Sequence, residues 1–157
     1  MRLSRSTATR SGAAAVELAL LMPLVAFLLL GVWEVGRMLN ISQILSNAAR
    51  EGARQASTGQ NTASQVQTAV LNYLQDAGIP TANVNVTVSD LTSAGTDPAN
   101  AGQLDQLQVT VTIPFADVRW IALNFIAGSG SQISGSAIWL SLKDQTYPST
   151  VTPPLGF

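Results

Sequence analysis

An almost continuous apolar run occupies residues 13–33, and only Glu17 and Pro23 break its pattern. A helix rises about 1.5 Å per residue, so a helix over this run is roughly 30 Å long, which is the thickness of the hydrocarbon core of a bilayer. The run therefore predicts one transmembrane helix, with Pro23 as a position where the helix can kink.

The next segment keeps the helical period but becomes more polar. Between Arg37 and Ala56, apolar or small residues recur in steps of three and four, at Met38, Ile41, Leu45, Ala48 and Gly52. We therefore expect the membrane helix to continue outward as one helix to about Ser57. In one interpretation this stripe packs against the protein's own sheet, and in the other it packs against a neighbouring subunit.

The charged residues near the end of the long helix also allow two interpretations. Glu51 and Arg54 are three positions apart, which is close enough to pair on a helix surface. Together with Arg50, they form either a solvated face or a binding patch.

A second, shorter helix is predicted after a break at residues 58–61. It begins at Thr62, and Gln65 follows in the spacing of a capping box. Gly78 and Pro80 provide the stop signal. The apolar face of this helix consists of Val66, Ala69, Val70, Tyr73, Leu74 and Ala77.

Three later segments alternate between apolar and polar residues, which is the period of a β-strand. Their apolar faces consist of Val84, Val86 and Val88, then Leu107, Val109, Val111 and Ile113, and then Ile138, Leu140 and Leu142. Three such strands can cover the outer half of the long helix. The chain therefore predicts an α+β fold, with a second helix and a roughly three-stranded antiparallel sheet forming a head on a helical stalk.

The remaining segments are irregular. Residues 90–105 have no periodicity and predict a long loop that is exposed or mobile. Residues 117–125 form either a short helix that caps the sheet or an exposed apolar patch for a partner subunit. The proline-rich tail from Tyr147 is expected to be extended. The resulting organisation is a basic leader (1–12), the transmembrane helix (13–33), its outward extension (34–57) and an extracytoplasmic head (58–157).

The charges orient this helix in the membrane. Arg2, Arg5 and Arg10 precede the span, and no acidic residue accompanies them. Basic residues beside a span stay in the cytoplasm, so we expect the N-terminus inside and the head outside, in a single-pass protein of the cytoplasmic membrane. The formal net charge of −1 gives no basic surface for nucleic acid.

A secretory signal peptide has a similar layout, with a basic start and an apolar stretch. Small residues two positions apart should then precede the cut, but the bulky Val32 and Trp33 occupy those positions. The apolar run is also longer than an ordinary signal core. Removal of the whole run therefore fits the sequence poorly.

The amino-acid composition lacks the residue types on which most catalytic mechanisms depend. The chain has no cysteine and no histidine, which excludes disulfides, cysteine-ligated metals and the commonest general base. Lys143 is the single lysine, and no serine completes a nucleophile-elbow pattern. Asp90, Asp97 and Asp105 carry the oxygens that calcium prefers, but their spacing fits no known calcium loop. We expect neither enzymatic activity nor a cofactor.

Glu17 carries the most informative charge, because a carboxylate near the bilayer centre costs roughly 2.5–3.5 kcal/mol on insertion scales. It lies about one helical turn inside the span, so its side chain can reach the headgroups in one interpretation. In the other, the chain is cut between Gly12 and Ala13, and Glu17 becomes the fifth residue of the mature chain. The free amine of a neighbouring subunit then neutralises it, and such a buried pair fixes the register of stacked helices.

A basic leader, a glycine and a hydrophobic helix with glutamate at its fifth residue resemble the type IV pilins. More narrowly, residues 12–23, 34–37 and 48–54 resemble the TadE-like family, the minor pilins or pseudopilins of tight-adherence (Tad/Flp) pilus systems. The residues of this resemblance are Gly12, Ala13, Glu17, Pro23, Glu34, Gly36, Arg37, Ala49, Arg50, Glu51, Gly52, Ala53 and Arg54. Residues 113–115 and 133–139 are more loosely similar. Leu18 departs from the pattern, because the family often has an aromatic residue there.

The resemblance implies a structural subunit that enters, primes or caps a pilus used for adhesion. It implies processing by a prepilin peptidase between Gly12 and Ala13, and assembly through the N-terminal helix with Glu17 as the assembly residue. The implied partners are the major pilin, other minor pilins, the peptidase, membrane lipid and an inner-membrane assembly platform powered by a cytoplasmic ATPase. The alternative is a single-pass anchored binding module that does not assemble and needs no cut at Gly12.

Overall fold

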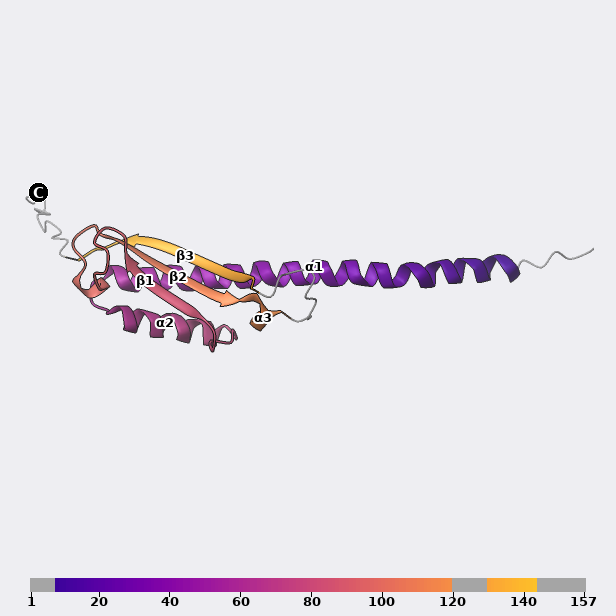
Figure 1. Ribbon diagram of the computed structural model, residues 1–157, viewed down its shortest axis with the longest axis horizontal. Coiled ribbons are helices and arrows are strands. Elements are labelled where there is room, and N and C mark those ends of the chain that lie inside the picture. The colour runs from indigo at the N-terminus through magenta and orange to yellow at the C-terminus, as the bar shows by residue number, and fades with distance from the viewer. Residues whose placement is uncertain (1–7, 120–129, 144–157) are drawn as a thin grey trace, which may run out of the picture.

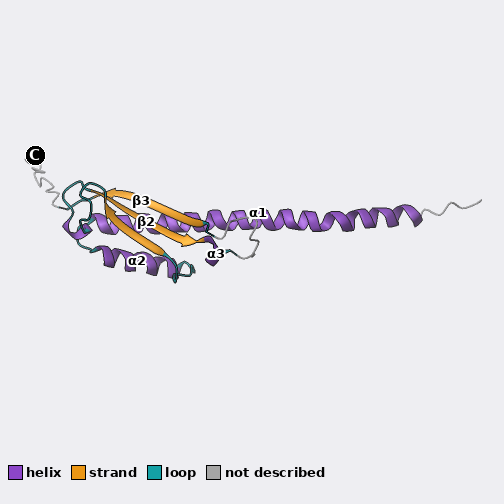
Figure 2. Ribbon diagram, viewed as in Figure 1, coloured by secondary structure: helices purple, strands orange, loops and turns teal. Residues whose placement is uncertain are grey.

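The computed structural model describes residues 8–119 and 130–143. In these residues, two helices are followed by three strands, with two short helical turns between the strands (Figure 1, Figure 2). The elements are α1 (Ala8–Ser57), α2 (Ala63–Asp76), β1 (Asn85–Asp90), the 3-10 turn η1 (Pro98–Asn100), β2 (Gln106–Pro114), α3 (Phe115–Val118) and β3 (Gln132–Leu140). The predicted α+β fold is confirmed.

α1 is a single helix of 50 residues. Its N-terminal half protrudes from the molecule, and its C-terminal half lies along the sheet (Figure 1). Pro23 lies inside the helix and does not interrupt it. The helix ends at Ser57, as the sequence predicts, and it begins at Ala8, so Gly12 is helical.

α2 begins with the predicted capping box. The Thr62 hydroxyl accepts a hydrogen bond from the Gln65 amide, and the Gln65 side chain accepts one from the Thr62 amide. Gly78 follows the helix in the left-handed backbone region (φ = 75°), which fits its role as a stop signal. Tyr73 is 39% exposed, and Ala77, the C-cap residue of α2, is exposed as well, so the assignment of these two residues to the apolar face is wrong. The buried residues of α2 are Val66, Val70 and Leu74.

The strands form one antiparallel sheet in the order β1–β2–β3, as predicted. Val86 of β1 and Gly135 of β3 flank Val111 of the central strand. The buried face of β2 is the predicted one and consists of Leu107, Val109, Val111 and Ile113. This face covers the C-terminal half of α1.

The sequence prediction for β3 is wrong in two respects, namely where the strand begins and which of its faces is buried. The strand begins well before the predicted segment. Ile138 and Leu140 are 52% and 47% exposed, and Leu142 beyond the strand is exposed as well, although the alternation predicts all three on the buried face. Ile133 and Gly135 are the buried residues of β3. Side chains alternate between the two faces of a strand. Since Ile133 and Gly135 face the core, the even-numbered residues of β3, including Ile138 and Leu140, face outward.

The core lies between the C-terminal half of α1, α2 and one face of the sheet. The apolar stripe of α1 faces the protein's own sheet, and Ile41, Leu45 and Ala48 are buried there. Met38 is 45% exposed, so the buried part of the stripe begins one turn later than predicted.

Two glycines allow this close packing. At Gly135, an added Cβ would stand 2.5 Å from the Ser46 amide nitrogen and 2.6 Å from the Leu45 carbonyl carbon. At Gly52 of α1, an added Cβ would stand 2.6 Å from Cγ2 of Val70 in α2. Neither position tolerates a side chain without a shift of its neighbours.

Residues 90–105 are only partly the exposed loop that the sequence predicts. Pro98 opens η1 and is fully buried, and Ala101 beyond it is buried as well. The carboxylates of this segment accept hydrogen bonds from backbone amides, from Thr92 and Ser93 to Asp90, from Ala63 and Ala99 to Asp97, and from Gly102 to Asp105. Among residues 8–119 and 130–143, no group of acidic side chains is arranged to hold a metal ion.

The helix predicted within residues 117–125 corresponds in part to α3, a single turn that begins earlier, at Phe115. Phe115 and Val118 are buried against the core. Residues 120–129 lie outside the described residues, so the alternative of an apolar patch there stays open. The predicted extended tail from Tyr147 lies outside them as well.

Candidate assembly surface on the N-terminal helix

The protruding half of α1 carries its apolar side chains on the outside of the molecule. Within the described residues, α1 is the one helix that is long and apolar enough to cross a membrane, and its most apolar window has no buried residue. Leu20, Val32 and Trp33 are 75%, 73% and 63% exposed. Removing one such side chain from water is worth roughly 1.5–3 kcal/mol, so this surface favours contact with lipid or with other helices.

The predicted processing and assembly residues lie on this exposed part of α1. Gly12, Ala13 and Glu17 are all exposed. A Cβ added at Gly12 would meet no atom within 4 Å, so packing among the described residues gives no reason for a glycine there. In the described part of the chain, the Glu17 carboxylate has no ion-pair partner. Pro23 is exposed as well and lies one to two turns further along the span.

Glu34 lies at the transition from the span to the head, and it is only 5% exposed. Neither of its carboxylate oxygens has a hydrogen-bond partner among the described residues. A buried carboxylate without a partner is strongly destabilising, because desolvation is not offset by a hydrogen bond or an opposite charge. Among the motif residues that the structure describes, Glu34 is therefore the one whose buried polar atoms lack hydrogen-bond partners.

Arg37, one turn after Glu34, connects α1 to the base of the head. Its Nε atom donates a hydrogen bond to the carbonyl oxygen of Val118 in α3, at 2.5 Å. Gly36 beside it is exposed, and a Cβ there would meet no atom within 4 Å. A hollow of about 380 Å³ lies on this side of the helix, lined by Trp33, Gly36, Arg37 and Asn40.

Residues 49–54, the most distinctive part of the resemblance, divide between two faces of α1. Ala49 and Ala53 are fully buried, and Gly52 lies at the close approach to α2. Arg50 and Arg54 are exposed on the other side. The small residues of the motif therefore let α1 pack against α2 and the sheet, while the basic residues face outward.

Glu51 and Arg54 form the ion pair that their spacing predicts. The Nη2 and Nε atoms of Arg54 donate to the two oxygens of Glu51 at 2.6 and 2.9 Å, and the Gln55 amide donates to Glu51 at 2.9 Å. The hydrogen bond from Arg54, and then that from Gln55, lower the pKa of Glu51 to about 2. The Glu51 and Arg54 side chains are 34% and 56% exposed, so this is a solvated surface pair of small energetic weight.

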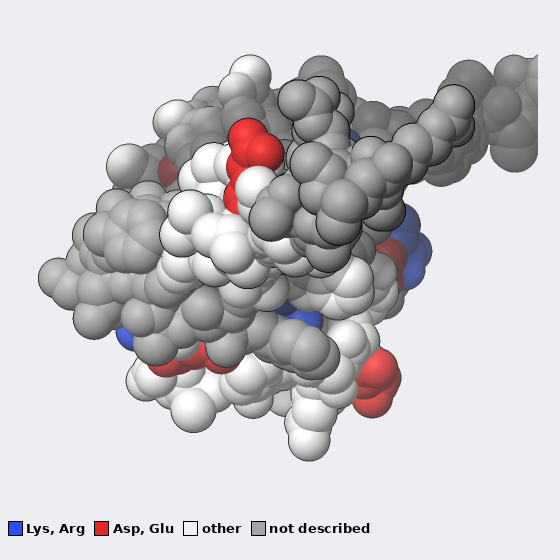
Figure 3. Space-filling model, turned by 90° about the vertical axis from the view of Figure 1, so that its right-hand side faces the viewer, with Lys and Arg blue, Asp and Glu red and all other residues white. Residues whose placement is uncertain are grey.

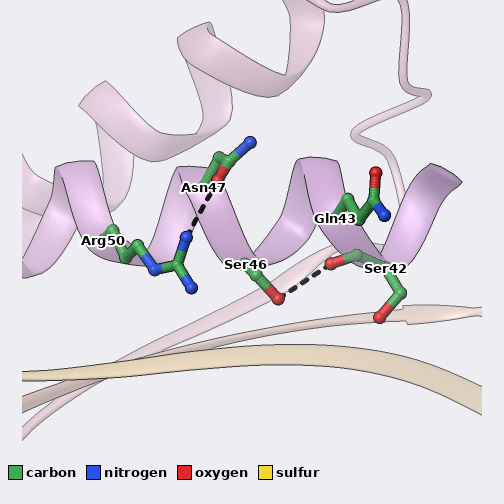
Figure 4. A pocket seen from close by; sticks show the side chains of 5 residues that line it. All are labelled: Ser42, Gln43, Ser46, Asn47 and Arg50. Atoms are coloured by element: carbon green, nitrogen blue, oxygen red, sulfur yellow. Dashed lines mark hydrogen bonds between the residues drawn. The ribbon is translucent and has the colours of Figure 1, made fainter. Parts of the chain in front are cut away.

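The polar side of α1 carries a shallow hollow that the sequence pattern did not predict. It measures about 390 Å³ and is lined by Ser42, Gln43, Ser46, Asn47 and Arg50 (Figure 4). Arg50 donates to the Asn47 side-chain oxygen at 3.3 Å, and the Ser46 hydroxyl donates to the Ser42 carbonyl at 2.9 Å. The sequence feature that could have indicated this hollow is the set of uncharged polar residues of α1 that lie off the apolar stripe.

Two other structural residues were also missed. The first is Gly135, where β3 approaches the backbone of α1 closely. A glycine inside a strand often marks such a close approach of two backbones. The burial of Glu34 had no local signal, because it depends on what packs over the helix. Among the described residues that are visible from the N-terminal end of α1, basic and acidic side chains lie in several small groups and form no single large patch (Figure 3).

The long exposed helix, the second helix and the three-stranded antiparallel sheet on its outer half define a pilin-like layout. Residues 12–54 match the sequence model of the family described as TadE-like protein. The match extends over the whole set of motif residues between Gly12 and Arg54 and confirms the resemblance, and it points to a component associated with the Tad pilus. No curated protein and no solved structure matched the chain.

Proposed function

We propose that this protein is a minor pilin-like structural subunit, and not an enzyme, that takes part in assembly of a Tad/Flp pilus used for adhesion and surface attachment. The observation that carries the proposal is the continuity of α1. One helix presents apolar side chains to the outside along its first half and holds the folded head along its second half. Such a helix suits both storage in a membrane and packing among other helices in a fibre.

Processing by a prepilin peptidase between Gly12 and Ala13 is part of this proposal. Gly12 is exposed, and none of the residues that the structure describes packs where its side chain would be. We therefore attribute the requirement for glycine at this position to another protein. A peptidase that must close around the backbone there would impose it.

Glu17 is proposed to accept the new N-terminal ammonium group of an adjacent subunit. Support comes from its exposure on the span and from the lack of an ion-pair partner within the described residues. A carboxylate in lipid is costly unless an opposite charge approaches it. The pair would also fix the axial register between neighbouring helices.

The proposed location is the cytoplasmic (inner) membrane, with the N-terminus inside, the head outside, and later entry into the extracellular pilus. The proposed partners are the major and minor pilins, the prepilin peptidase, the inner-membrane assembly platform and membrane lipid. The length and composition of the exposed half of α1 support the membrane part of this proposal.

Mass spectrometry of the membrane-bound protein tests the proposal, with a mature N-terminus at Ala13 as the expected result. Gly12→Phe should leave an uncut precursor. Gly31→Phe is the matched control, because a Cβ added at Gly31 also meets no atom within 4 Å, and it should be processed normally. An intact Met1, or a cut after Gly36, would instead favour an anchored binding module or a secreted protein.

A further inference from the structure

The two edges of the sheet differ in how they are covered. The edge at β1 lies against α2, and the Gln67 side chain donates a hydrogen bond to the Val86 carbonyl there. The edge at β3 has no such cover among the residues that the structure describes. β3 also contains no charged residue and no proline, which are common means of keeping an edge strand from pairing with another chain.

The register of β3 shows which of its backbone groups lie on this open edge. The Phe115 amide donates to the Ser131 carbonyl, and the Ser141 amide donates to the Asp105 carbonyl. Bonded pairs alternate along an antiparallel ladder, so the odd-numbered residues between these two pairs also bond to β2. The even-numbered residues therefore direct their N–H and C=O groups away from β2. They are Gln132, Ser134, Ser136, Ile138 and Leu140.

The last residue of α1 closes one end of this edge. The Leu142 amide, which has the same orientation, donates to the Ser57 carbonyl. Within the described ranges, the even-numbered residues from 132 to 140 make no backbone hydrogen bond to another element. Space is present beside them, because Ser46, which lies against Gly135, also lines the hollow of about 390 Å³ on the exposed side of α1 (Figure 4). The open edge therefore has room for a further strand.

The C-terminal half of β3 also carries exposed apolar side chains. Ile138 and Leu140 lie on the outer face of the sheet and are about half exposed. Leu91 lies across the sheet from Leu140, since both are paired with Gln106, and it is 48% exposed. An exposed apolar surface of this kind usually marks a contact site. Because the same residues offer backbone groups and apolar side chains, the site fits an extended strand that bonds along the edge and packs alternate side chains on the outer face.

The chain itself supplies such a segment directly after β3. The sequence continues for 14 residues beyond Lys143, and an extended chain of this length reaches roughly 45 Å. A strand as long as β3 spans roughly 30 Å, so this segment is long enough to run back along the edge. Residues 146–152 read Thr-Tyr-Pro-Ser-Thr-Val-Thr, which is rich in the β-branched and aromatic residues that favour strands.

The prolines of this segment define which of its residues can pair. Proline has no N–H, so in a sheet it fits only where the N–H would point to solvent. With Pro148 in that orientation, alternation directs the backbone groups of Tyr147, Ser149 and Val151 toward β3. Pro153 would then point toward β3, so the pairing ends before it. Pro148 also removes an N–H from the new outer edge, which hinders pairing with yet another strand.

We propose that residues 147–152 add to β3 of the same chain as an antiparallel strand and cover its open edge. Tyr147 then lies opposite Leu140, and Val151 lies opposite Ser136. Directly opposed residues share a face of the sheet, so the two added side chains lie on the outer face, over Leu140 and the neighbouring Ile138.

Attachment to the same chain favours this pairing over pairing with a second copy. The segment starts a few residues after β3 ends, so its effective concentration at its own edge is roughly millimolar or higher. Once covered, the edge can no longer pair with another head, and the exposed half of α1 remains available for contacts between chains. Docking of this segment involves the head alone and does not depend on the proposed role in a pilus.

Disulfide formation in the full-length protein in its membrane tests the docking, because the chain has no cysteine of its own. Ser136→Cys with Val151→Cys places two thiols directly opposite each other on the outer face. Ser136→Cys with Thr150→Cys is the matched control, since Thr150 would point to the other face. Oxidation should join the first pair at least roughly fivefold more than the control, because a disulfide needs converging Cβ atoms as well as a short Cα distance.

Two outcomes of this experiment would contradict the docking. Equal yields for the pairs with Val151 and with Thr150 would show that the segment does not lie along β3 as a strand. A disulfide-linked dimer, in place of a disulfide within one chain, would overturn the choice of the same chain and indicate that copies exchange this segment. The mass of the oxidised product separates the two kinds of disulfide.

Amide hydrogen exchange provides a second measurement. The Ile138 amide points along the open edge, opposite Ser149 in the docked strand. Ser149→Pro removes an N–H that faces β3 and should speed exchange at Ile138 by roughly tenfold or more. Thr150→Pro is the control and should keep the slow exchange, since the N–H of Thr150 would point to solvent. Equal exchange at Ile138 in the parent and in Ser149→Pro would overturn the proposal.

Discussion

Gly135 of β3 lies directly against the backbone of Ser46 in α1, where an added Cβ would stand 2.5 Å from the amide nitrogen. The obstacle is main chain rather than the end of a flexible side chain, so it cannot rotate away. This contact holds the edge strand of the sheet flat on the part of α1 that carries the head. It also decides which residues of β3 face the core.

Gly135→Ala should therefore destabilise the head. We expect a loss of about 2 kcal/mol or more, because overpacking a tight contact forces a shift of the backbone. The measurement is denaturant unfolding of the full chain in detergent micelles. Gly130→Ala is the matched control, since its Cβ would meet no atom within 4 Å, and it should change stability little. Equal stability of the two variants would show that β3 does not pack on α1 in this way.

Glu34→Gln should leave the protein as stable as the parent or make it more stable. The buried carboxylate of Glu34 has no hydrogen-bond partner among the described residues, and an amide is easier to desolvate than a charge. The expected gain is on the order of 1 kcal/mol, measured by the same unfolding experiment. Glu51→Gln on the same helix should act in the opposite direction, because it weakens the contact with Arg54. A large loss of stability in Glu34→Gln would indicate that the carboxylate is paired in the folded protein.

The ion pair of Glu51 should give stability a specific dependence on pH. The hydrogen bonds from Arg54 and Gln55 lower the pKa of Glu51 from 4.5 to about 2 in the folded protein. A lowered pKa of an acid stabilises the fold above the unfolded pKa, and this contribution is lost as the pH falls through the folded value. The small stability difference between the parent and Glu51→Gln should therefore be present at neutral pH and vanish near pH 2. Unfolding curves across this range measure it, and a difference that persists unchanged at the acid end would contradict the pairing.

Glu17→Ala should be processed normally but assemble poorly. The substitution leaves Gly12 and Ala13 intact and removes the carboxylate that is proposed to pair with a neighbouring ammonium group. Two quantities are measured for each variant: the position of the mature N-terminus, and the amount of subunit recovered in sheared fibres. Leu18→Ala, at the next exposed position of the span, is the control and should assemble nearly as well as the parent. Normal incorporation of Glu17→Ala into fibres would exclude the proposed charge pair.

The sequence by itself determined the features that depend on neighbours along the chain. The apolar run predicted the exposed half of α1, and the steps of three and four predicted its continuation to Ser57. Thr62 and Gln65 predicted the start of α2, and alternating residues predicted the three strands. The pattern from Gly12 to Arg54 predicted the family that the sequence model matches. Helical and strand periods, caps and motifs are local properties, so they can be read without the fold.

Only the tertiary structure decided which side of β3 is inside, whereas the buried face of β2 and most of the buried stripe of α1 were the predicted ones. The period of β3 allowed either face to be buried, and the contact of Gly135 with Ser46 selected the one that leaves Ile138 and Leu140 outside. The steric role of Gly52 depends on Val70 of another helix. The burial of Glu34 likewise depends on what lies across the helix from it. Burial is set by segments that are distant in sequence, and a period of two or of about 3.6 residues carries no information about where those segments pack.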